Sequence, residues 1–484
     1  MRSCSRKWKT IEAKYSCYSD YFASNKYEKN SQKILNSSEL YISLPMKYLK
    51  NLITTMSALL RFTVENFRSI AERKSISFIP DSIKDEPKSN VFLSDGFSYL
   101  RTAAIYGANS SGKSNLVDAM GCMSSIIVNS VKVNDKEKLP YLPFRLNKVN
   151  SHQPTLYEVD AVIDGVRYKY SFSNTDKRIV SEQLLRIEKT GSEKPLFIRT
   201  IEGIGVNEKL FPEGEDLESK TNDNRLFISL VGQLGGKLSN SIINFFDSTL
   251  NTLSGLDTDN YSSFTKYMLN KDLPGCETMK EFFFRVQLGF SNLTTTIREF
   301  SISELPEKLP REMRESIAKE LAGKQLVQVF SSHKIYDEEG NAIDSADFDF
   351  SEMESAGTQK LFDMAGPIFD TLYRGAILVV DELDAKMHPL ISRELVSLFN
   401  DPERNPKGAQ LIFTTHDTNL LSSNLLRRDQ IWFTEKDQME RTDVYSMRHI
   451  VLPDGTKPRG DGNMERNYIK GRYGAIPYIQ PSID

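Results

Sequence analysis

Residues Gly107–Ser114 have the types and spacing of a phosphate-binding loop. They read Gly-Ala-Asn-Ser-Ser-Gly-Lys-Ser and fit the pattern G-x-x-x-x-G-K-[ST]. An apolar run over 102–106 precedes them and predicts a buried strand, and apolar residues at helical spacing follow from Leu116 to Ile127. Backbone N–H groups and a helix N-terminus attract phosphates in this setting. We therefore predict a nucleotide cradle formed by Gly107, Ala108, Asn109, Ser110, Ser111, Gly112, Lys113, Ser114 and Asn115. Lys113 would reach the β- and γ-phosphates, and the Ser114 hydroxyl would bind Mg²⁺.

Two adjacent acidic residues, Asp381 and Glu382, follow the continuous aliphatic run 376–380. Such a run is typical of a parallel strand buried on both faces, and open α/β sheets bind ligands at the carboxyl ends of their strands. We predict that Asp381 holds Mg²⁺ and that Glu382 is the general base for an attacking water. The simpler alternative is that the pair only begins a helix.

Two further motifs complete an ordered set. His416 ends a predicted strand over 411–415, where it would sense the γ-phosphate, although a lone histidine there is more often structural. The sequence Ser355-Ala-Gly-Thr358 precedes an apolar helical run and predicts an anion-binding helix start, in which Ser355, Gly357 and Thr358 approach a phosphate. By itself, Ser-x-Gly before a helix is usually only a cap.

Composition limits the classes of protein. The chain has 484 residues, 62 Lys and Arg against 65 Asp and Glu, and a formal net charge of −3, so no global positive field indicates nucleic acid. Its four cysteines form no C-x-x-C pair, which favours free thiols over a disulfide framework or a zinc site. No apolar run has the length of a membrane span and no signal peptide is recognisable. We expect a cytoplasmic protein without a membrane partner.

Changes of pattern along the chain predict five parts. We expect a poorly ordered extension over 1–55, and the first half of the nucleotide-binding fold over 56–180. That half includes a hairpin over 156–172 that turns at Asp164-Gly165. Residues 181–345 are predicted to form a mainly helical insert, with helical patterns near 240–250, 278–287 and 311–323 and no sustained heptad. The second half follows over 346–440, and 441–484 form a tail.

The order of these motifs resembles that of ABC-type ATPases, including the chromosome-maintenance and recombination-repair branch. It is most similar to bacterial stand-alone AAA/ABC-like ATPases linked to abortive infection and restriction loci, including overcoming-lysogenization-defect-like proteins. In this resemblance Gly107–Ser114 match Walker A, Ser355–Gln359 the signature loop, Ile377–Glu382 Walker B, Asp384–His388 the D-loop region and His416 the switch histidine. The stretches Phe62–Ser69, Gly408–Asp417 and Gly471–Pro477 support it, over about 57–480.

The resemblance implies an α/β P-loop NTPase of the ABC-ATPase head type, with a mixed sheet, an antiparallel β lobe and a mainly helical insert. It implies ATP and Mg²⁺ as cofactors and a homodimer that sandwiches ATP, with Ser355 and Gly357 acting in trans; a higher oligomer and a nucleic-acid ligand stay open. The leading function is a switch in antiphage defence with a separate effector, and the alternative is a DNA repair or recombination ATPase. His388 departs from the usual D-loop Asp, no Q-loop is placed (Gln153 is a weak candidate), and no nuclease residues are recognisable.

Overall fold

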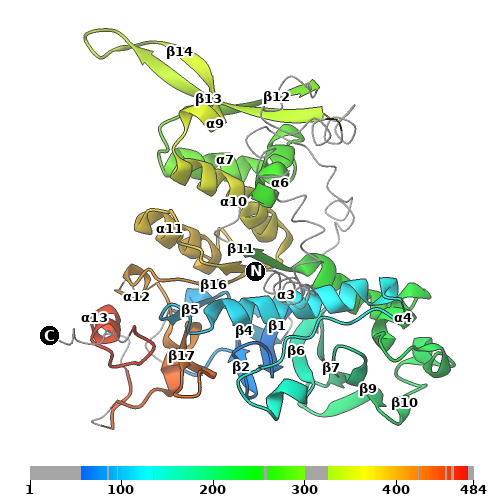
Figure 1. Ribbon diagram of the computed structural model, residues 1–484. Coiled ribbons are helices and arrows are strands. Elements are labelled where there is room, and N and C mark those ends of the chain that lie inside the picture. Colours follow the sequence, from blue (N-terminus) through cyan, green and yellow to red (C-terminus); the bar gives the residue numbers. More distant parts are fainter. Residues whose placement is uncertain are drawn as a thin grey trace, which may run out of the picture. The chain divides into compact units, whose positions relative to one another are not determined.

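The computed structural model describes residues 56–83, 87–94, 96–134, 136–254, 259–299, 315, 325–422, 425–452, 455–458 and 463–477 (Figure 1). The predicted extension over 1–55 and all but residue 315 of the helical pattern over 311–323 lie outside them. The described residues fall into two compact units. The first holds residues 259–369, and the second holds residues 56–254 and 370–477. We describe each unit by itself.

A six-stranded sheet at the centre of the second unit carries the predicted motifs. Its strand order is β11-β15-β16-β5-β17-β18, and all neighbours are parallel except the last pair. The strands are β11 (Leu250–Ser254), β15 (Ile377–Asp381), β16 (Gln410–Thr414), β5 (Thr102–Gly107), β17 (Ile431–Lys436) and β18 (Thr442–Ser446). The predicted strands at β5, β15 and β16 are confirmed, and β15 and β16 are almost wholly buried, as their aliphatic composition requires.

The predicted helices after the phosphate-binding loop and after Ser355 are present as α3 (Lys113–Asn129) and α10 (Ala356–Arg374), and the C-terminal part of α10 belongs to this unit. The unit also contains α11 (Pro389–Asn400), α12 (Asn419–Ser422) and α13 (Met464–Ile469), which were not predicted. Helix α3 packs close to β11: a Cβ on Gly121 would lie 3.1 Å from Thr252 Oγ1. The strand β11 was not predicted, because its mixed composition follows the helical pattern near 240–250.

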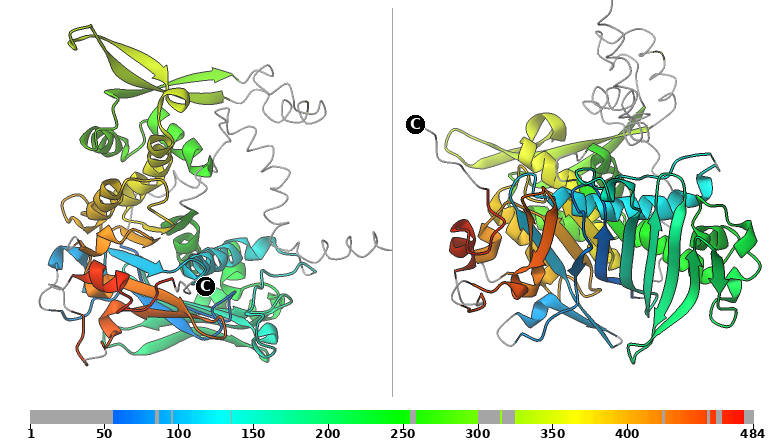
Figure 2. Two further views of the ribbon diagram at one scale, coloured as in Figure 1. Left: turned by 60° about the vertical axis from the view of Figure 1, so that its left-hand side comes forward. Right: turned by 60° about the horizontal axis from the view of Figure 1, so that its bottom comes forward.

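A seven-stranded antiparallel sheet forms the β lobe of the same unit. Its order is β10-β9-β8-β7-β6-β1-β2, and the strands lie side by side in Figure 2. They are β1 (Ala58–Glu65), β2 (Lys74–Ser77), β6 (Thr155–Ile163), β7 (Val166–Asn174), β8 (Ile179–Ile187), β9 (Glu193–Thr200) and β10 (Gly203–Val206). The predicted hairpin is β6–β7, and both turn residues, Asp164 and Gly165, have positive φ values of 49° and 77°. A type I′ turn requires such angles, so the turn chemistry agrees with the sequence.

The side chain of Gln410 joins the two large sheets. Its amide accepts from Leu59 N of β1 at 2.7 Å and donates to Leu59 O at 3.0 Å, while it also donates to Leu100 O at 3.0 Å. A short hairpin, β3 (Val91–Ser94) with β4 (Phe97–Leu100), supplies the last of these acceptors. Because Gln410 is buried, these bonds fix how β16 lies against the β lobe.

The structure corrects the predicted insert. Residues 181–206 belong to the antiparallel sheet as β8, β9 and β10, and 250–254 belong to the parallel sheet as β11. Between them lie α4 (Phe227–Gln233), α5 (Lys237–Asn244) and a π-helix (Phe245–Thr249). The separate unit therefore begins only after β11, and it contains a sheet as well as helices. The tail also differs from the prediction, because β18 at its start is a strand of the parallel sheet.

The first unit combines helices with a three-stranded antiparallel sheet, β12-β13-β14. Its elements are α6 (Asp259–Asn270), α7 (Cys276–Arg285), β12 (Asn292–Glu299), β13 (Gln325–Tyr336), β14 (Ala342–Asp349), α9 (Phe350–Met353) and the N-terminal part of α10. Its core contains an aromatic cluster, in which Phe350 and Phe362 have ring centroids 4.7 Å apart and Phe282 and Phe369 5.4 Å apart.

A proline inside α10 is compensated by a threonine of α6. Pro367 has no N–H to bond to the carbonyl of Asp363 one turn earlier. Thr265 Oγ1 donates to that carbonyl at 2.8 Å and accepts from Gly366 N at 3.0 Å. A Cβ on Gly366 would lie 2.5 Å from the same hydroxyl, so glycine permits this close approach. The bonds hold α6 against α10 within the unit. No helix among the described residues is long and apolar enough to cross a membrane.

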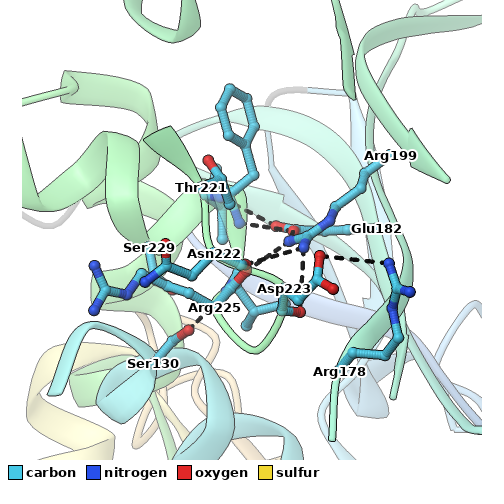
Figure 3. A network of polar contacts seen from close by, with 12 residues as sticks. Ser130, Arg178, Glu182, Arg199, Thr221, Asn222, Asp223, Arg225 and Ser229 are labelled. Carbon is cyan, nitrogen blue, oxygen red and sulfur yellow. Dashed lines mark hydrogen bonds and ion pairs between the residues drawn. The ribbon is translucent and has the colours of Figure 1, made fainter. Parts of the chain in front are cut away.

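A buried polar network holds the start of α4 to the β lobe (Figure 3). The fully buried Glu182 of β8 accepts from Phe227 N at 2.7 Å, Ile228 N at 3.0 Å and Tyr170 Oη at 3.0 Å. Arg199 of β9 lies 3.7 Å from its carboxylate and donates to the carbonyl of Arg225 at 2.6 Å. Burial raises the pKa of Glu182, and Arg199 opposes the rise.

The network also reaches α3. Ser130, at the end of that helix, accepts from Leu226 N at 2.7 Å, and Ser229 Oγ donates to Ile127 O at 2.9 Å. Helix α4 is thus bonded both to the β lobe and to the helix that begins at the phosphate-binding loop.

Replacing Glu182 with Ala tests this network. The change would remove the buried acceptor of two backbone N–H groups and of the Tyr170 hydroxyl, and would take the carboxylate away from Arg199, so we expect the free energy of unfolding to fall by about 3–5 kcal/mol. Urea denaturation followed by circular dichroism measures it. The matched change Glu193→Ala removes an exposed ion pair with Lys169 on the same sheet and should cost less than about 1 kcal/mol. Equal losses from the two variants would contradict the role given to Glu182.

Candidate nucleotide-binding site

Three neighbouring parallel strands bring the predicted residues to one edge of the sheet. In the register, Thr414 of β16 pairs with Ile105 of β5, and Phe413 of β16 pairs with Val380 of β15. Because the strands run in the same direction, the loop 107–112, the pair 381–382 and residue 416 all leave the sheet at the same edge. This is the edge at which open α/β sheets bind ligands.

The loop between β5 and α3 is bent at glycine. Gly112 precedes the first turn of α3 with φ 109°, in the left-handed region that favours glycine. Lys113 is only 6% exposed, and its Nζ donates back across the loop to Gly107 O at 2.9 Å and Ala108 O at 3.2 Å. The predicted Asn109 and Ser110 are exposed, and Ser110 has φ 65°. The loop is therefore folded around the lysine, with its central residues facing solvent.

Threonines of the last two strands support the loop from behind. Thr434 Oγ1 of β17 lies 2.6 Å from Ser111 Oγ, and Thr442 Oγ1 of β18 donates to Ser111 O at 2.8 Å. A Cβ on Gly107 would lie 2.5 Å from Thr434 O, and one on Gly112 would lie 2.2 Å from Thr442 Oγ1. The two glycines of the motif are thus required by contacts with β17 and β18 as well as by the turn.

The turn after β1 contacts the first turn of α3. Ser69 Oγ lies 2.7 Å from Thr442 Oγ1 and accepts from Asn115 Nδ2 at 2.5 Å. Arg68 forms an ion pair with Asp118 and donates to Asn115 Oδ1 at 3.4 Å. The predicted Asn115 therefore uses its side chain to hold this turn. Beside it lies a cavity of about 290 Å³ lined by Arg68, Ser69, Leu142, Pro143, Phe144, Arg145, Leu146, Lys436 and Glu440.

Thr414 organises the carboxylate side of the edge. Its Oγ1 donates to Asp381 Oδ1 at 2.6 Å and accepts from Glu382 N at 2.7 Å. Glu382 has φ 57°, a strained conformation for a residue other than glycine. One hydroxyl thus orients the predicted metal ligand and holds the unusual backbone of the predicted base.

Asp384 is the third carboxylate of this group. Its Oδ2 accepts from His416 N at 3.3 Å, whereas its Oδ1 is buried and has no hydrogen-bond partner among the described residues. A buried acceptor without a donor is uncommon in native proteins and indicates a site that a further polar group completes.

The charges at this edge affect one another. Burial lowers the pKa of Lys113, and Asp381, Glu382 and Asp384 oppose this by raising it. Burial and Lys113 lower the pKa of His416, which the same three carboxylates raise. His416 is therefore neutral near pH 7, while Lys113 lies within electrostatic reach of all three carboxylates. Sequence reasoning placed Lys113, Asp381, Glu382 and His416 at one site, and the structure brings these four residues to one edge.

The residues fit a magnesium nucleotide in their chemistry. A hydroxyl on Ser114 and a carboxylate on Asp381 are oxygen ligands, which Mg²⁺ prefers. Among the described residues, no group of three or more His, Cys, Asp or Glu is arranged to hold a metal ion. An ion at Ser114 and Asp381 would therefore need phosphate oxygens and water as its other ligands, the usual arrangement for nucleotide-bound Mg²⁺.

The signature residues lie in the first unit. Ser355 Oγ accepts from Thr358 N at 3.2 Å, so the predicted cap on α10 is present. Ser355 is exposed, and Gly357 and Thr358 are half-buried. Ligand binding by these three residues stays a prediction.

Sequence reasoning missed the residues that support the site. Thr434 and Thr442 carry no motif, because their contact with the loop depends on how β17 and β18 pair with β5. Thr414 lies two residues before His416 in a predicted strand, and its position beside β15 could have suggested its role. Gln153, the weak Q-loop candidate, lies in the loop before β6, where its carbonyl accepts from Asn66 and Tyr141.

A glycine loop between a parallel strand and a helix, with acidic residues at the end of another strand of the sheet, defines a P-loop nucleotide-binding protein. Family comparison matches residues 103–422 to the family described as "AAA domain, putative AbiEii toxin, Type IV TA system". This match spans more than half of the sequence, and the chain belongs to this family of P-loop ATPases.

Solved structures similar to the chain include chromosome-maintenance heads and a recombination protein. One is the SMC head domain from Thermotoga maritima, with 13% identity over 80% of this chain and 98% of that chain and a TM-score of 0.35. Another is the Smc head domain derived from Pyrococcus furiosus with an extended coiled coil, bound to the C-terminal domain of ScpA (13% identity, 81% and 96% coverage, TM-score 0.32). A third is the recombination mediator protein RecF with ATP, with 13% identity over 82% of this chain and 99% of that chain and a TM-score of 0.32. No curated protein sequence matches the chain.

Replacing Thr414 with Val tests the orientation of the carboxylates. The change keeps the shape but removes one hydrogen bond to Asp381 and one from Glu382 N, so we expect Mg²⁺-dependent ATP binding to weaken about 10-fold, a cost of about 1.4 kcal/mol. Isothermal titration with ATP, with and without Mg²⁺, measures it. Thr155→Val removes a buried hydrogen bond to Asn66 O in the β lobe and should leave ATP binding unchanged. If both variants weaken ATP binding equally, the effect is one of general stability.

Proposed function

We propose that this protein binds and hydrolyses ATP and works as a nucleotide-driven dimeric switch. The observation that carries the proposal is the meeting of Lys113, Asp381, Glu382 and His416 at the sheet edge beside the loop 107–112. Membership of an ATPase family supports nucleotide as the ligand. When bound, Mg²⁺-ATP supplies the phosphoanhydride bond and the charge compensation that hydrolysis requires.

Each residue has a role that its surroundings support. Lys113, now bonded to two carbonyl oxygens of the loop, would exchange these acceptors for the β- and γ-phosphates. Ser114 and Asp381 would hold Mg²⁺, the latter in the orientation set by Thr414. Glu382 would accept a proton from the attacking water, and neutral His416 would donate a hydrogen bond towards the γ-phosphate. Most of the catalysis would come from positioning and charge stabilisation.

The cavity beside Ser69 is suited to the remaining part of the ligand. Its volume of about 290 Å³ and its mixed lining of apolar and cationic side chains suit a nucleoside. Two of its residues, Arg68 and Ser69, contact Asn115 in the first turn of α3. We assign the base and ribose to this cavity.

A second copy of the chain would complete the site. Ser355, Gly357 and Thr358 form the N-terminal turn of α10, a 19-residue helix whose dipole favours an anion there. Ser355 is exposed, so it can contact a ligand held by another subunit. We therefore propose a homodimer in which ATP lies between the loop of one subunit and the signature turn of the other.

The cellular role is proposed from the family. Its description names a toxin of a toxin–antitoxin system, which supports a role in bacterial antiphage defence. The chain would act in the cytoplasm as a sensor or scaffold that releases a separate toxic effector, and we expect no nuclease activity of its own. Strong stimulation of hydrolysis by DNA would favour the alternative, a repair or recombination ATPase.

Two substitutions separate binding from hydrolysis. Lys113→Ala removes the main cation that faces the phosphates and should abolish ATP binding. Glu382→Gln should retain binding, slow hydrolysis by about 10²–10⁴-fold and accumulate dimer, because the base is lost and the charge on the ligand is not. Phosphate release, ATP titration and light scattering measure these effects.

Glu403→Gln, an exposed carboxylate after α11, is the matched control and should behave as wild type. Hydrolysis by Glu382→Gln at the wild-type rate would remove Glu382 from its role. ATP binding by Lys113→Ala at the wild-type affinity would place the ligand elsewhere.

Mixing two inactive variants tests the shared site. Ser355→Arg would block the signature turn, and Lys113→Ala would empty the loop, so neither variant should hydrolyse ATP alone. A mixed dimer has one intact site, formed by the loop of the first and the turn of the second, and an equimolar mixture should regain roughly a quarter of wild-type activity. Absence of any recovery, with dimers still present, would show that Ser355 does not act in trans.

A further inference from the structure

We propose that the β13–β14 ribbon of the first unit is a docking surface for a basic, extended segment of a partner protein, which adds as a strand along the edge of β14. The ribbon consists of β13, the turn 337–341 and β14. It extends beyond helices α6 and α7 of its own unit in Figure 1. No residue assigned to the ATPase site belongs to this ribbon. We therefore look to the exposed side chains and charges of the ribbon for a separate binding role.

The edge of the ribbon is open for pairing. In the order β12-β13-β14, β14 pairs with β13 on one side and with no other strand among the described residues. Its side chains are exposed except for two that are half-buried. An edge strand offers a row of backbone donors and acceptors, and strand addition to such an edge is a common mode of peptide recognition.

Apolar side chains lie exposed along the same ribbon. Ile343 is 63% exposed and Tyr336 58%, while Ile335 and Phe348 are each 36% exposed. Ile343 and Phe348 both belong to β14, and Ile343 lies where the β13–β14 register shifts between Ile335 and Tyr336. A strand added beside β14 would cover part of this exposed apolar surface.

The charge of the ribbon selects the partner. Lys334 of β13 is the one Lys or Arg of the ribbon. From Ile335 to Gln359 no Lys or Arg occurs, whereas this stretch holds eight carboxylates, Asp337, Glu338, Glu339, Asp344, Asp347, Asp349, Glu352 and Glu354. The whole chain has a net charge of only −3, so this local excess is not a property of the composition.

Among the described residues, the ribbon carboxylates are engaged by hydrogen bonds and not by ion pairs. Hydrogen bonds from Asn341 lower the pKa of Asp337; burial raises that of Asp349, but hydrogen bonds from Ser351 and Gln328 lower it overall. Asp347 accepts from Ser332 Oγ at 2.5 Å. None of the carboxylates from Asp337 to Asp349 forms an ion pair within the described part of the chain.

The negative charge of the ribbon disfavours a second copy of this chain as the bound strand and favours a basic segment of another protein. Two copies of the chain that paired through β14 would place like charges beside one another, which is unfavourable across strands. A segment rich in Lys or Arg would gain from the same charges. The acidic edge thus disfavours self-association and selects a basic strand.

The docking surface is connected to the signature turn. Asp349, the last residue of β14, caps α9 by accepting from Ser351 N at 2.8 Å. His333 Nε2 of β13 lies 2.9 Å from Oε1 of Glu354, the residue before Ser355, whose side chain is 6% exposed. Gln359 of α10 donates to the carbonyls of Ser351 and Glu354. A strand bound to β14 would therefore act on the start of α10. The effect of this coupling on the ATPase site rests on the proposed function. Docking of the strand itself does not depend on that function.

The test uses the full chain and a defined peptide. The probe is a fluorescein-labelled ten-residue peptide of alternating Val and Lys, with two controls: the same peptide with Pro in place of alternate Val, and a Val–Glu peptide. Fluorescence anisotropy at 0.15 M salt should show binding of the Val–Lys peptide alone. Hydrogen exchange should show new amide protection over 342–349.

Charge reversal locates the surface. The double variant Glu338→Lys/Asp344→Lys changes two exposed carboxylates and should weaken peptide binding at least 10-fold. The matched control Glu202→Lys, an exposed acidic residue of the second unit, should not change it. Lys113→Ala should bind the peptide as wild type does, so failure of the proposed ATPase function would leave this result intact.

Three results would overturn the proposal. These are equal binding of the Val–Lys and Pro-containing peptides, equal binding by the charge-reversed and control variants, and no new amide protection over 342–349. Circular dichroism confirms that each variant is folded.

Discussion

The parallel alignment of β15, β16 and β5 is the constraint on which the rest of the site depends. Each strand ends in a different polar segment, and none of these segments is near another in the sequence. The ladder between the strands sets them at one edge, and the Thr414 hydroxyl fixes the relation between β16 and β15 by bonding to both Asp381 and Glu382 N. A shift of one residue in either pairing would turn these side chains to the other face of the sheet.

Burial gives this edge its electrostatic character. Lys113 is almost fully buried, which lowers its pKa, and three carboxylates within electrostatic reach oppose this fall. Desolvation and Lys113 both lower the pKa of His416, so its imidazole is neutral near pH 7. The site thus holds a lysine, three acidic side chains and a neutral donor together, and the buried Asp384 Oδ1 has no hydrogen-bond donor among the described residues. Such a mixture is costly unless a charged ligand completes it.

The supports around the edge are polar and buried. Thr434 and Thr442 hold the loop from β17 and β18, Gln410 bonds β16 to the β lobe, and Glu182 bonds α4 to the same lobe. Each satisfies backbone groups that would otherwise be unpaired away from water, which makes each contact specific in geometry. In the first unit Thr265 serves the same purpose for the helix that Pro367 interrupts. The ribbon β13–β14 differs from these supports, because most of its carboxylates are exposed and those from Asp337 to Asp349 form no ion pair with a described residue.

The sequence alone determined the elements that carry chemistry. The spacing of Gly107, Gly112 and Lys113 predicted the loop, aliphatic runs predicted β5, β15 and β16, and Asp164-Gly165 predicted the hairpin, because each signal is local in the chain. Tertiary structure decided which sheet each strand joins and which side chains from different strands meet. The strands β8, β9 and β10 joined the β lobe, and β11 joined the parallel sheet, because strands gain their stability from neighbours that may be distant in sequence. The supporting roles of Thr414, Thr434 and Thr442 were not predicted for the same reason. A threonine becomes part of a site only when strand pairing places its hydroxyl beside a loop or a carboxylate.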